Sequence, residues 1–395
     1  MNELEEILHK YHQKALLEKM ETFSEKEKEQ LLKQLKKCNI LTFSKKIKKN
    51  FFHNAKPLTK VHVENFEEAC IGRKAIEKQL VGVVILAGGQ GSRLGHFGPK
   101  GTFVLDKIQK SLFQILFEKI YRIETFLNVK IPVAIMVSKE NEIETKKYLK
   151  ENQYFHLSEE FVQFFTQKES PFVSENGVWI LESNESFSLG STGNGAFYKD
   201  FIDSKAFEFF KKMGVSSVSI VPVDNPLADP LNPFFIGHHI HFKNDVTVQC
   251  IEQKDSKSLA GVLACKSEKV GIIEYLDLDP SMQQEKYAYL NCGIYVFSID
   301  FIQRAAKYDL PIHKAKKKTT SFGKKIYAYK LEMFIFDAFE KAEKSSAFLT
   351  LKEKSFAPIK NLEGIDSAET AQKAIIKALN DAYPFPENFW IRYLY

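Results

Sequence analysis

The sequence predicts an α/β protein with a mixed, mostly parallel sheet that carries helices on both faces. Three short apolar runs are typical of buried strands, and they lie at residues 81–89, 131–138 and 215–226. Residues 111–126 and 142–155 between them have a helical period. Strands that alternate with helices of about 10–15 residues are typical of a parallel sheet covered on both faces. Such sheets bind ligands beyond the carboxyl ends of their strands.

The first region, residues 1–75, is predicted to be mostly helical. Apolar residues recur at a spacing of three or four from Leu4 to Leu16, which predicts one amphipathic stripe. Ser24 is followed by Glu27 in a capping-box pattern, so a helix is expected to begin there.

The central domain is expected at residues 76–325, and a small C-terminal region at residues 326–395. Residues 162–167 lead into a further strand of the central domain. Residues 247–279 have the pattern of three strands joined by turns, which predicts an antiparallel addition to the sheet. The C-terminal region is expected to be α+β, with a helix over residues 370–383.

Composition favours a soluble cytoplasmic protein without a nucleic-acid or membrane partner. The 395 residues are 44% hydrophobic, and the five cysteines form no C-x-x-C pair, as in a reduced intracellular protein. The N-terminus lacks the apolar core of a signal peptide, and no apolar run approaches the ~20 residues of a membrane helix. The formal charge of +6 comes from lysines spread among glutamates. The denser basic runs at residues 45–50 and 314–318 are interpreted as solvated loop or helix faces.

The segment with the clearest chemistry is VVILAGGQGSRLGHFGPKGTF, residues 83–103. A strand that runs through a glycine-rich turn into a helix offers backbone N–H groups and the positive end of the helix dipole to an anion. Gly88, Gly89 and Gly91 let the backbone approach a phosphate or a base closely. Arg93 and Lys100 add positive charge for a polyphosphate.

Two better-known phosphate loops and a purely structural glycine turn are the alternatives. A Walker A loop needs Ser or Thr after its lysine, whereas Gly101 follows Lys100. The Rossmann dinucleotide fingerprint is one residue shorter than GQGSRLG, and Ser138 stands where an acidic residue would end the second strand. A Rossmann oxidoreductase is the weaker hypothesis, and it predicts stabilisation by NADH but not by UTP.

The segment LAGGQGSRLGHFGPKG closely resembles the signature of the UDP-sugar pyrophosphorylases (UDPGP type 1 family). Its Gln and Arg make it most similar to the eukaryotic-type UDP-N-acetylglucosamine pyrophosphorylases. The resemblance continues collinearly between about residues 60 and 380, through FFTQKESP, SLGSTGNGAFYKDF, VDNPLADP, AGVLACKSEKVGIIEY, YLNCGIYVFS, YKLEMFIFDAF and FAPIKN. So many segments in the same order are more than chance would produce.

The resemblance implies a Rossmann-like, GT-A-like nucleotidyltransferase fold and a uridylyltransferase activity. Members of the family convert UTP and a sugar 1-phosphate into UDP-sugar and pyrophosphate, with Mg²⁺ as cofactor. The sugar phosphate attacks the α-phosphorus in line, so the protein positions the substrates and neutralises charge without a nucleophile of its own. A monomer or weak oligomer is expected.

By the same resemblance, each candidate residue has an implied role. The catalytic cations are Arg93, Lys100 and Lys330, which face phosphates, and Asp224 is the metal ligand. The uridine and its phosphates are held by Gly88, Gly89, Gly91, Gln167, Gly193 and Asn194. The amide of Gln167 suits a uracil edge because it both donates and accepts. The sugar side is implied at Gly261, Glu274, Asn291 and Lys317.

Several of these residues also have simple structural interpretations. Lys100 can be a solvated loop lysine, Gln167 a surface glutamine at a strand end, Asp224 a turn cap, and Glu274 a member of a rim ion pair. The histidines His238, His239 and His241 raise the question of a metal site, although histidines in the core or on the surface of a helix are commoner.

The sugar is the least determined part of the implied activity. The loop TGNGA, residues 192–196, departs from the usual family pattern close to the sugar, as do Thr102 and Phe103. N-acetylglucosamine 1-phosphate is predicted because Gly-Asn-Gly follows that subfamily. Glucose 1-phosphate is the first alternative, galactosyl analogues stay open, and a non-catalytic UDP-sugar-binding protein is the alternative of a different class.

Overall fold

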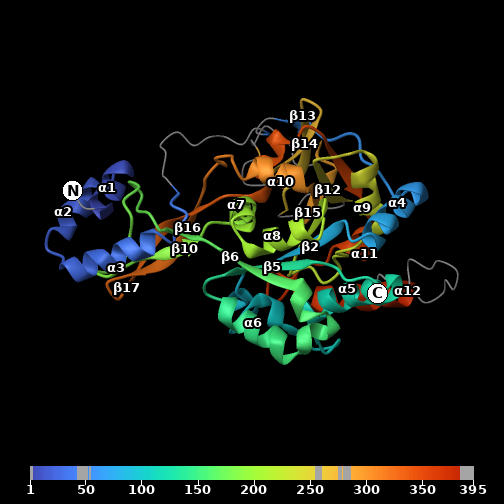
Figure 1. The fold of residues 1–395 in the computed structure, drawn as a ribbon, viewed down its shortest axis with the longest axis horizontal. Helices are drawn as coiled ribbons and strands as arrows, with labels where there is room; N and C mark the ends of the chain where they lie inside the picture. Colours follow the sequence, from blue (N-terminus) through green and yellow to red (C-terminus); the bar gives the residue numbers. More distant parts are fainter. Residues whose placement is uncertain are drawn as a thin grey trace. The chain divides into compact units, whose positions relative to one another are not determined.

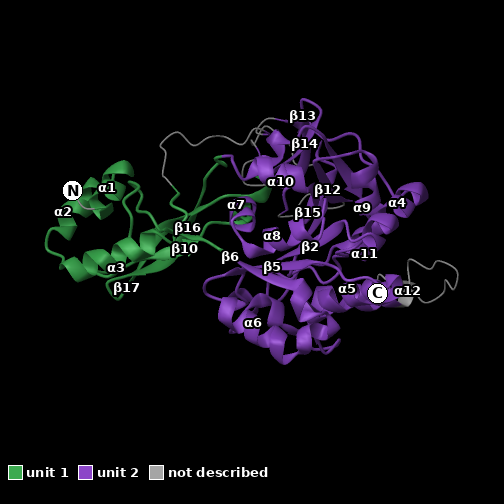
Figure 2. Ribbon diagram, in the orientation of Figure 1, with its two compact units in different colours: residues 1–50, 167–197, 309–337 green, residues 51–166, 198–308, 338–395 purple. Residues whose placement is uncertain are grey.

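The structure is a computed structural model that describes residues 3–41, 52, 55–253, 260–274, 278 and 286–382. The chain divides into two compact units, each assembled from three segments (Figure 2). Unit 1 comprises residues 1–50, 167–197 and 309–337, and unit 2 comprises residues 51–166, 198–308 and 338–395. The predicted division at 75/76 and 325/326 follows the order of the sequence and stays a prediction, whereas the units gather segments that are distant in sequence.

Unit 2 is built on one large sheet (Figure 1). Its strands are β1 (Lys56–Pro57), β2 (Val81–Leu86), β5 (Val133–Ser138), β6 (Val162–Gln167), β11 (Ser217–Pro222), β12 (Val246–Glu252), β13 (Val262–Lys266), β14 (Lys269–Ile273), β15 (Tyr289–Ser298) and β18 (Ser345–Leu349). The main order is β1-β13-β15-β11-β2-β5-β6, with β12 paired to β15 and β18 and with β14 paired to β13. The predicted strands at Val81, Ile131 and Val215 are confirmed as β2, β5 and β11.

The sheet is parallel at its centre and largely antiparallel on one side, where β18 alone of the described strands pairs in parallel, with β12. β2 pairs in parallel with both β5 and β11. β15 runs antiparallel to β11, β12 and β13. The predicted mixed sheet is confirmed, but its antiparallel part is larger than a mostly parallel sheet implies. The segment predicted as an antiparallel addition joins the main sheet through β15; residues 254–259, 275–277 and 279 of that segment lie outside the described part.

Helices cover both faces of this sheet, as predicted. Successive side chains of a strand point to opposite faces, and every residue of β5 is buried, so both faces are shielded from solvent. The helices are α4 (Phe66–Glu77), α5 (Leu112–Leu127), α6 (Glu142–Glu151), α7 (Phe197–Ile202), α8 (Lys205–Lys212), α9 (Pro233–His241), α10 (Ile299–Ala305), α11 (Lys352–Ser355) and α12 (Ala368–Ala382). Within the described residues, none of the helices is both long enough and apolar enough to cross a membrane.

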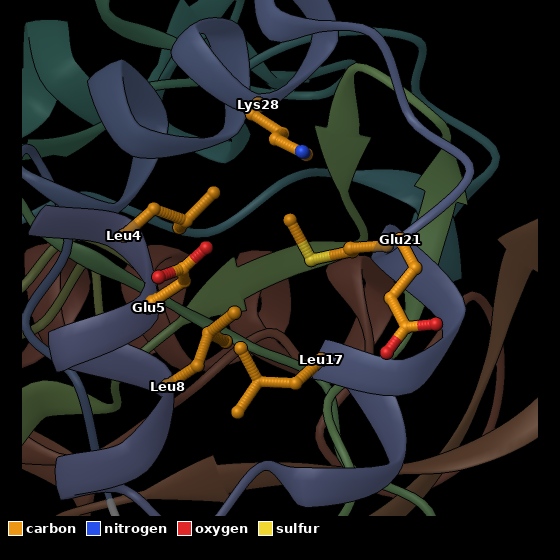
Figure 3. Close-up of a pocket in the computed structure, with 7 residues that line it drawn as sticks. Leu4, Glu5, Leu8, Leu17, Glu21 and Lys28 are labelled. Atoms are coloured by element: carbon orange, nitrogen blue, oxygen red, sulfur yellow. The ribbon is translucent and has the colours of Figure 1, made fainter. Parts of the chain in front are cut away.

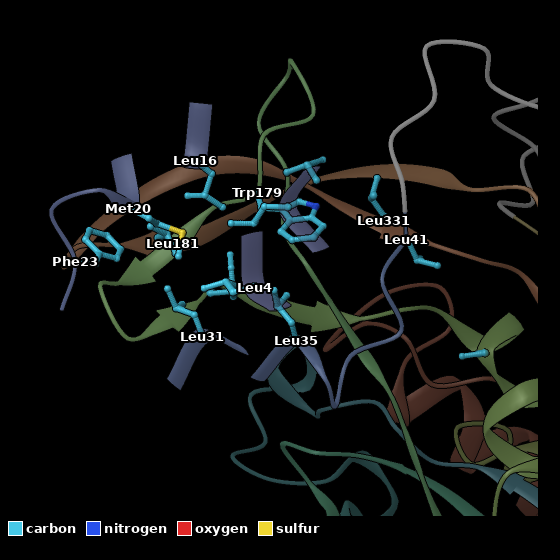
Figure 4. Packing of buried hydrophobic residues seen from close by; sticks show 14 of the residues in the cluster. Leu4, Leu16, Met20, Phe23, Leu31, Leu35, Leu41, Trp179, Leu181 and Leu331 are labelled. Carbon is cyan, nitrogen blue, oxygen red and sulfur yellow. The ribbon is translucent and has the colours of Figure 1, made fainter. Parts of the chain in front are cut away.

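Unit 1 combines the N-terminal helices with strands from later in the chain (Figure 1). Its elements are α1 (Glu3–Lys10), α2 (Lys14–Met20), α3 (Glu25–Leu35), β7 (Glu169–Pro171), β8 (Leu181–Ser183), β9 (Ser186–Phe187), β10 (Leu189–Ser191), β16 (His313–Ser321) and β17 (Lys324–Glu332). Leucines of α1, α2 and α3 pack with Trp179 and Leu331 in one apolar cluster (Figure 4). The helices are therefore held by tertiary burial, which short helices need.

Details of unit 1 refine the sequence predictions. The stripe from Leu4 to Leu16 is divided between α1 and α2, because the chain turns at residues 11–13 with His12 at a φ of 57°. The capping box of Ser24 and Glu27 at the start of α3 is confirmed. The basic run at residues 314–318 lies on the strand β16, not on the predicted loop or helix, and its lysines are exposed. The run at residues 45–50 lies outside the described residues.

Two of the three histidines of α9 belong to the core, and the third, His241, is exposed. His238 and His239 are buried. His238 contacts Glu68 Oε2 at 3.0 Å and Ser346 Oγ at 2.8 Å, and His239 Nδ1 contacts Thr247 Oγ1 at 3.0 Å. No cluster of three or more potential metal-ligating side chains exists in the described part of the chain.

The His239→Asn substitution is expected to weaken the loss of stability at acidic pH. Burial, and then the neighbouring His238, lowers the pKa of His239 to about 3, against a smaller raising effect of Asp245. Protonation from pH 6.5 downward therefore favours the unfolded chain, by about 1.4 kcal/mol at pH 5.5 for one such histidine. Urea unfolding at pH 7 and pH 5.5 measures the free energy of unfolding at each pH. If the difference between the two values is the same in the variant and the wild type, His239 does not cause the loss of stability.

Candidate active site

The glycine-rich loop follows β2 but does not lead directly into a helix. The chain first makes two 3₁₀ turns, Ser92–Leu94 and Lys100–Thr102, and then the hairpin of β3 (Val104–Leu105) and β4 (Lys110–Ser111). α5 begins only at Leu112, with Ser111 as its N-cap. The predicted continuation of the loop directly into a helix is therefore wrong. Apolar periodicity locates α5 but does not reveal the hairpin before it.

The glycines of this loop lack a side chain for different local reasons. A Cβ added to Gly89 would meet no atom within 4 Å, so the backbone there borders open space. A Cβ on Gly91 would lie 2.7 Å from the ring of His96, which packs inside the loop. Gly91 therefore serves the packing of the loop, whereas Gly89 leaves room for a ligand. Gly88 before it is half-buried.

Lys100 and Asp224 meet at one edge of the sheet. β2 and β11 are parallel neighbours with Leu86 opposite Pro222, so the segments that follow them lie side by side. Lys100 Nζ donates to Asp224 Oδ2 at 2.8 Å. Lys100 is only 8% exposed, which does not fit a solvated loop lysine. Arg93, by contrast, is exposed and forms no ion pair with any described carboxylate.

The turn after β11 is capped by Asn225, not by Asp224. Asn225 Oδ1 accepts from the amides of Leu227 and Ala357, and its Nδ2 donates to Ser355 O. The Asp224 carboxylate is thus left for Lys100 and for a ligand. Mg²⁺ in nucleotide sites typically takes one or two carboxylates together with phosphate oxygens and waters. A single carboxylate that is not used to cap its turn fits that pattern.

Lys119 on α5 binds carbonyls of the same turn, and it was not among the site residues predicted from the sequence. Its Nζ donates to Pro226 O at 2.9 Å and to Ala228 O at 2.8 Å. Burial lowers the pKa of Lys119 to about 8, and burial raises the pKa of Asp229 to about 6, each offset in part by the opposite charge. The sequence did contain a signal for Lys119, because this lysine lies on the apolar face of α5, three residues after Leu116.

Three residues predicted for the sugar come together in unit 2. Asn291 N donates to Gly261 O at 2.9 Å. A Cβ on Gly261 would lie 3.4 Å from Glu274 Oε1. Tyr295, which the sequence did not indicate, orients Asn291 by accepting from its Nδ2 at 2.9 Å, while the other end of that amide accepts from Gly293 N. Burial raises the pKa of Tyr295, so the hydroxyl stays neutral.

Unit 1 contains the predicted uracil and ribose residues. Gln167 Nε2 donates to the carbonyl of Gly193, and Asn194 Oδ1 accepts from Ile335 N at 3.0 Å. Gly193 has a φ of 80°, and a Cβ there would lie 2.4 Å from Met333 O. Gln167 is buried, which does not fit a surface glutamine. The structure therefore joins Gln167 to the loop of Gly193 and Asn194.

The two predicted lysines of unit 1 lie on one hairpin. Lys330 on β17 donates to Ser191 Oγ at 2.7 Å and pairs with Glu332 at 2.8 Å. Lys317 on β16 is exposed. Ala315 lies opposite Lys330 and is two residues before Lys317, so the two lysines share a face of the hairpin.

A separate pocket of about 250 Å³ lies among α1, α2 and α3 (Figure 3). It is lined by Leu4, Glu5, Leu8, Leu17, Met20, Glu21 and Lys28. None of the predicted site residues contributes to it.

The fold and the loops at its strand ends define the class of protein. The structure of a UDP-N-acetylglucosamine pyrophosphorylase from Trypanosoma brucei in complex with an inhibitor matches with a TM-score of 0.81 and 26% identity, over 97% of this chain and 87% of that chain. The class is that of the nucleotidyltransferases. A family model described as UTP--glucose-1-phosphate uridylyltransferase (UDPGP) matches residues 20–369. The chain belongs to this family, the UDP-sugar pyrophosphorylases.

Curated relatives point to one branch of the family. UDP-N-acetylglucosamine diphosphorylase 2 of Arabidopsis thaliana is 32% identical over 78% of this chain and 66% of its own length. The UDP-N-acetylglucosamine pyrophosphorylase of Saccharomyces cerevisiae is 31% identical over 78% of this chain and 70% of its own length. The chain thus spans about two thirds of the Arabidopsis relative and is similar to UDP-N-acetylglucosamine pyrophosphorylases.

Proposed function

We propose that the protein transfers the uridylyl group of UTP to a sugar 1-phosphate and releases pyrophosphate, with N-acetylglucosamine 1-phosphate as the sugar substrate. The observation that carries the proposal is the Lys100–Asp224 pair at the joint end of β2 and β11, beside the open backbone at Gly89. Family membership supports the reaction class. The names of the curated relatives support the choice of sugar.

In this reaction an oxygen of the sugar 1-phosphate attacks the α-phosphorus of UTP. The bond from the α-phosphorus to the bridging oxygen breaks, and pyrophosphate leaves with that oxygen. Charge accumulates on the leaving group, where the fixed ammonium of Lys100 stabilises it. Arg93 and Lys330 are proposed as further cations for the phosphates. Uridine is assigned to Gly88, Gly89, Gly91, Gln167, Gly193 and Asn194, and the sugar phosphate to Gly261, Glu274, Asn291 and Lys317.

Asp224 is the residue that would hold Mg²⁺. When bound, Mg²⁺ neutralises phosphate charge and polarises phosphoryl oxygens. The Lys100 ammonium pairs with the Asp224 carboxylate at 2.8 Å. Binding of UTP would therefore give Lys100 new partners in the phosphates and free the carboxylate for the cation.

Pyrophosphate release tests the proposal directly. The purified protein is incubated with UTP, Mg²⁺ and, one at a time, the 1-phosphates of N-acetylglucosamine, N-acetylgalactosamine, glucose and galactose. Release is expected to be fastest with N-acetylglucosamine 1-phosphate. Faster release with glucose 1-phosphate would overturn the sugar assignment. Binding of UDP-sugar without release from any substrate would overturn the catalytic assignment and favour a non-catalytic binding protein.

The Gly89→Ala substitution is expected to weaken UTP binding about tenfold without lowering the unfolding temperature, since a methyl group there meets only the space assigned to the nucleotide. Gly91→Ala is the matched comparison: its Cβ would press on His96, so it is expected to lower the unfolding temperature. Calorimetric UTP titration and thermal unfolding of both variants measure the two effects. A Gly89→Ala protein with wild-type affinity would show that the nucleotide does not approach this backbone.

A further inference from the structure

Asn141 joins the end of β5 to the start of the glycine-rich loop. Its side chain is fully buried, at 0% exposure. Nδ2 donates to Ala87 O at 2.9 Å and to Gly89 O at 3.3 Å, and Oδ1 accepts from Ser138 N at 2.9 Å. Although Asn141 is the N-cap residue of α6, its side chain forms no cap hydrogen bond with that helix. Both polar atoms of the Asn141 side-chain amide therefore bind backbone groups at or just after the ends of β5 and β2.

These contacts fix the direction of two peptide groups. In a trans peptide the carbonyl and the following N–H point in opposite directions, and the chain contains no cis peptide among its described residues. With the carbonyls of Ala87 and Gly89 turned toward Asn141, the amides of Gly88 and Gln90 must point away from it. Lys100 N also donates to Gly89 O, at 3.1 Å, which holds the second peptide from another side.

The amides so directed are available to a ligand. Neither Gly88 N nor Gln90 N donates to an acceptor within the described residues. The backbone between them, at Gly89, borders open space. Two parallel donors on one side of a strand-end loop match an acceptor-rich ligand, such as a uracil carbonyl or a phosphate.

We propose that Asn141 is a positioning residue that orients the amides of Gly88 and Gln90 toward acceptor oxygens of the uridine nucleotide. The inference rests on the proposed function, because it assumes that the nucleotide binds at this loop. Asn141 acts only through the backbone and does not itself contact the ligand.

The test compares Asn141→Asp with Asn244→Asp. Aspartate keeps the shape and the acceptor for Ser138 N but cannot donate to two carbonyls. Asn244 is a matched control, because it is 3% exposed and its Nδ2 also makes two hydrogen bonds, to Thr247 and Ser346. Both variants are expected to lose stability, but only Asn141→Asp is expected to bind UTP about tenfold more weakly, as two misdirected hydrogen bonds imply.

Calorimetric titrations with UTP, UMP and uridine identify the acceptor. If Asn141→Asp also binds uridine more weakly than the wild type, the amides contact the base. If the affinity falls only for UTP and UMP, the amides contact phosphate. In kinetics, KM for UTP should rise more than KM for the sugar 1-phosphate. UTP affinity of Asn141→Asp within twofold of wild type would overturn the inference, while a wild-type protein that binds no UTP would overturn the proposed function itself.

Hydrogen exchange of the wild-type protein decides the matter if Asn141→Asp does not fold. UTP is expected to slow exchange at the amides of Gly88 and Gln90. Unchanged exchange at both amides in the presence of saturating UTP would overturn the inference.

Discussion

Lys100→Ala is expected to lower kcat for pyrophosphate release about 10³-fold, the upper end of what one preorganised charge contributes to a developing anion. Lys100 is held at 8% exposure by the loop and by Asp224, so its ammonium is already in place before charge develops. Its removal has two consequences. The leaving pyrophosphate loses a counter-charge, and the Asp224 carboxylate loses the partner that it has before UTP binds.

Lys110→Ala provides the control for Lys100→Ala. Lys110 lies on β4, just after the loop, and forms a partly exposed ion pair with Glu118, which contributes little to stability. The kcat of Lys110→Ala is expected to stay within twofold of the wild-type value. Initial rates at saturating UTP and sugar 1-phosphate, with thermal unfolding of each variant, separate catalysis from folding. A Lys100→Ala protein that keeps more than a tenth of wild-type kcat would contradict the role given to this lysine.

The sequence could predict the meeting of Lys100 and Asp224 because the underlying rule is topological. Each follows a short apolar strand, and parallel strands present their carboxyl ends at one edge of the sheet. The structure places β2 and β11 as parallel neighbours, so the two segments converge as expected. The resemblance to the family then attached chemical roles to positions that the strand pattern had already grouped.

Side chains that act by holding the backbone were not predictable in the same way. Tyr295 binds the side-chain amide of Asn291, its neighbour on β15, whereas Asn141 and Lys119 bind carbonyls from segments distant in sequence. No local pattern encodes such partners. Lys119 was the exception in part, since a charged residue on an apolar helix face needs a buried partner.

The division of the chain also lies beyond local patterns. Helical periodicity identified α1 and α3, but their apolar faces pack with Trp179 and Leu331, from segments that follow much later. Sequence order suggested consecutive regions, whereas burial unites whichever segments complete a core. For the same reason the length of the hairpin between the glycine-rich loop and α5 could not be foreseen from periodicity.

Asp224→Asn is expected to lower kcat about 10²- to 10³-fold and to raise the Mg²⁺ concentration needed for half-maximal rate, since an uncharged amide is a poorer ligand for a hard cation. The turn should survive, because Asn225 makes the capping hydrogen bonds. Spectroscopic titration of Mn²⁺ in the presence of UTP reports the cation affinity apart from turnover. Wild-type Mn²⁺ affinity in the variant would exclude Asp224 as the metal ligand.

The double variant Lys100→Ala/Asp224→Asn distinguishes a working pair from two independent residues. Independent residues would multiply their separate losses of kcat. Here both residues are proposed to act on the same polyphosphate, Lys100 directly and Asp224 through Mg²⁺, so the loss of either one misplaces the group that the other must stabilise. The double variant is therefore expected to lose less than the product of the single losses. Losses that multiply would instead mean that the 2.8 Å contact between Nζ and Oδ2 has no part in catalysis.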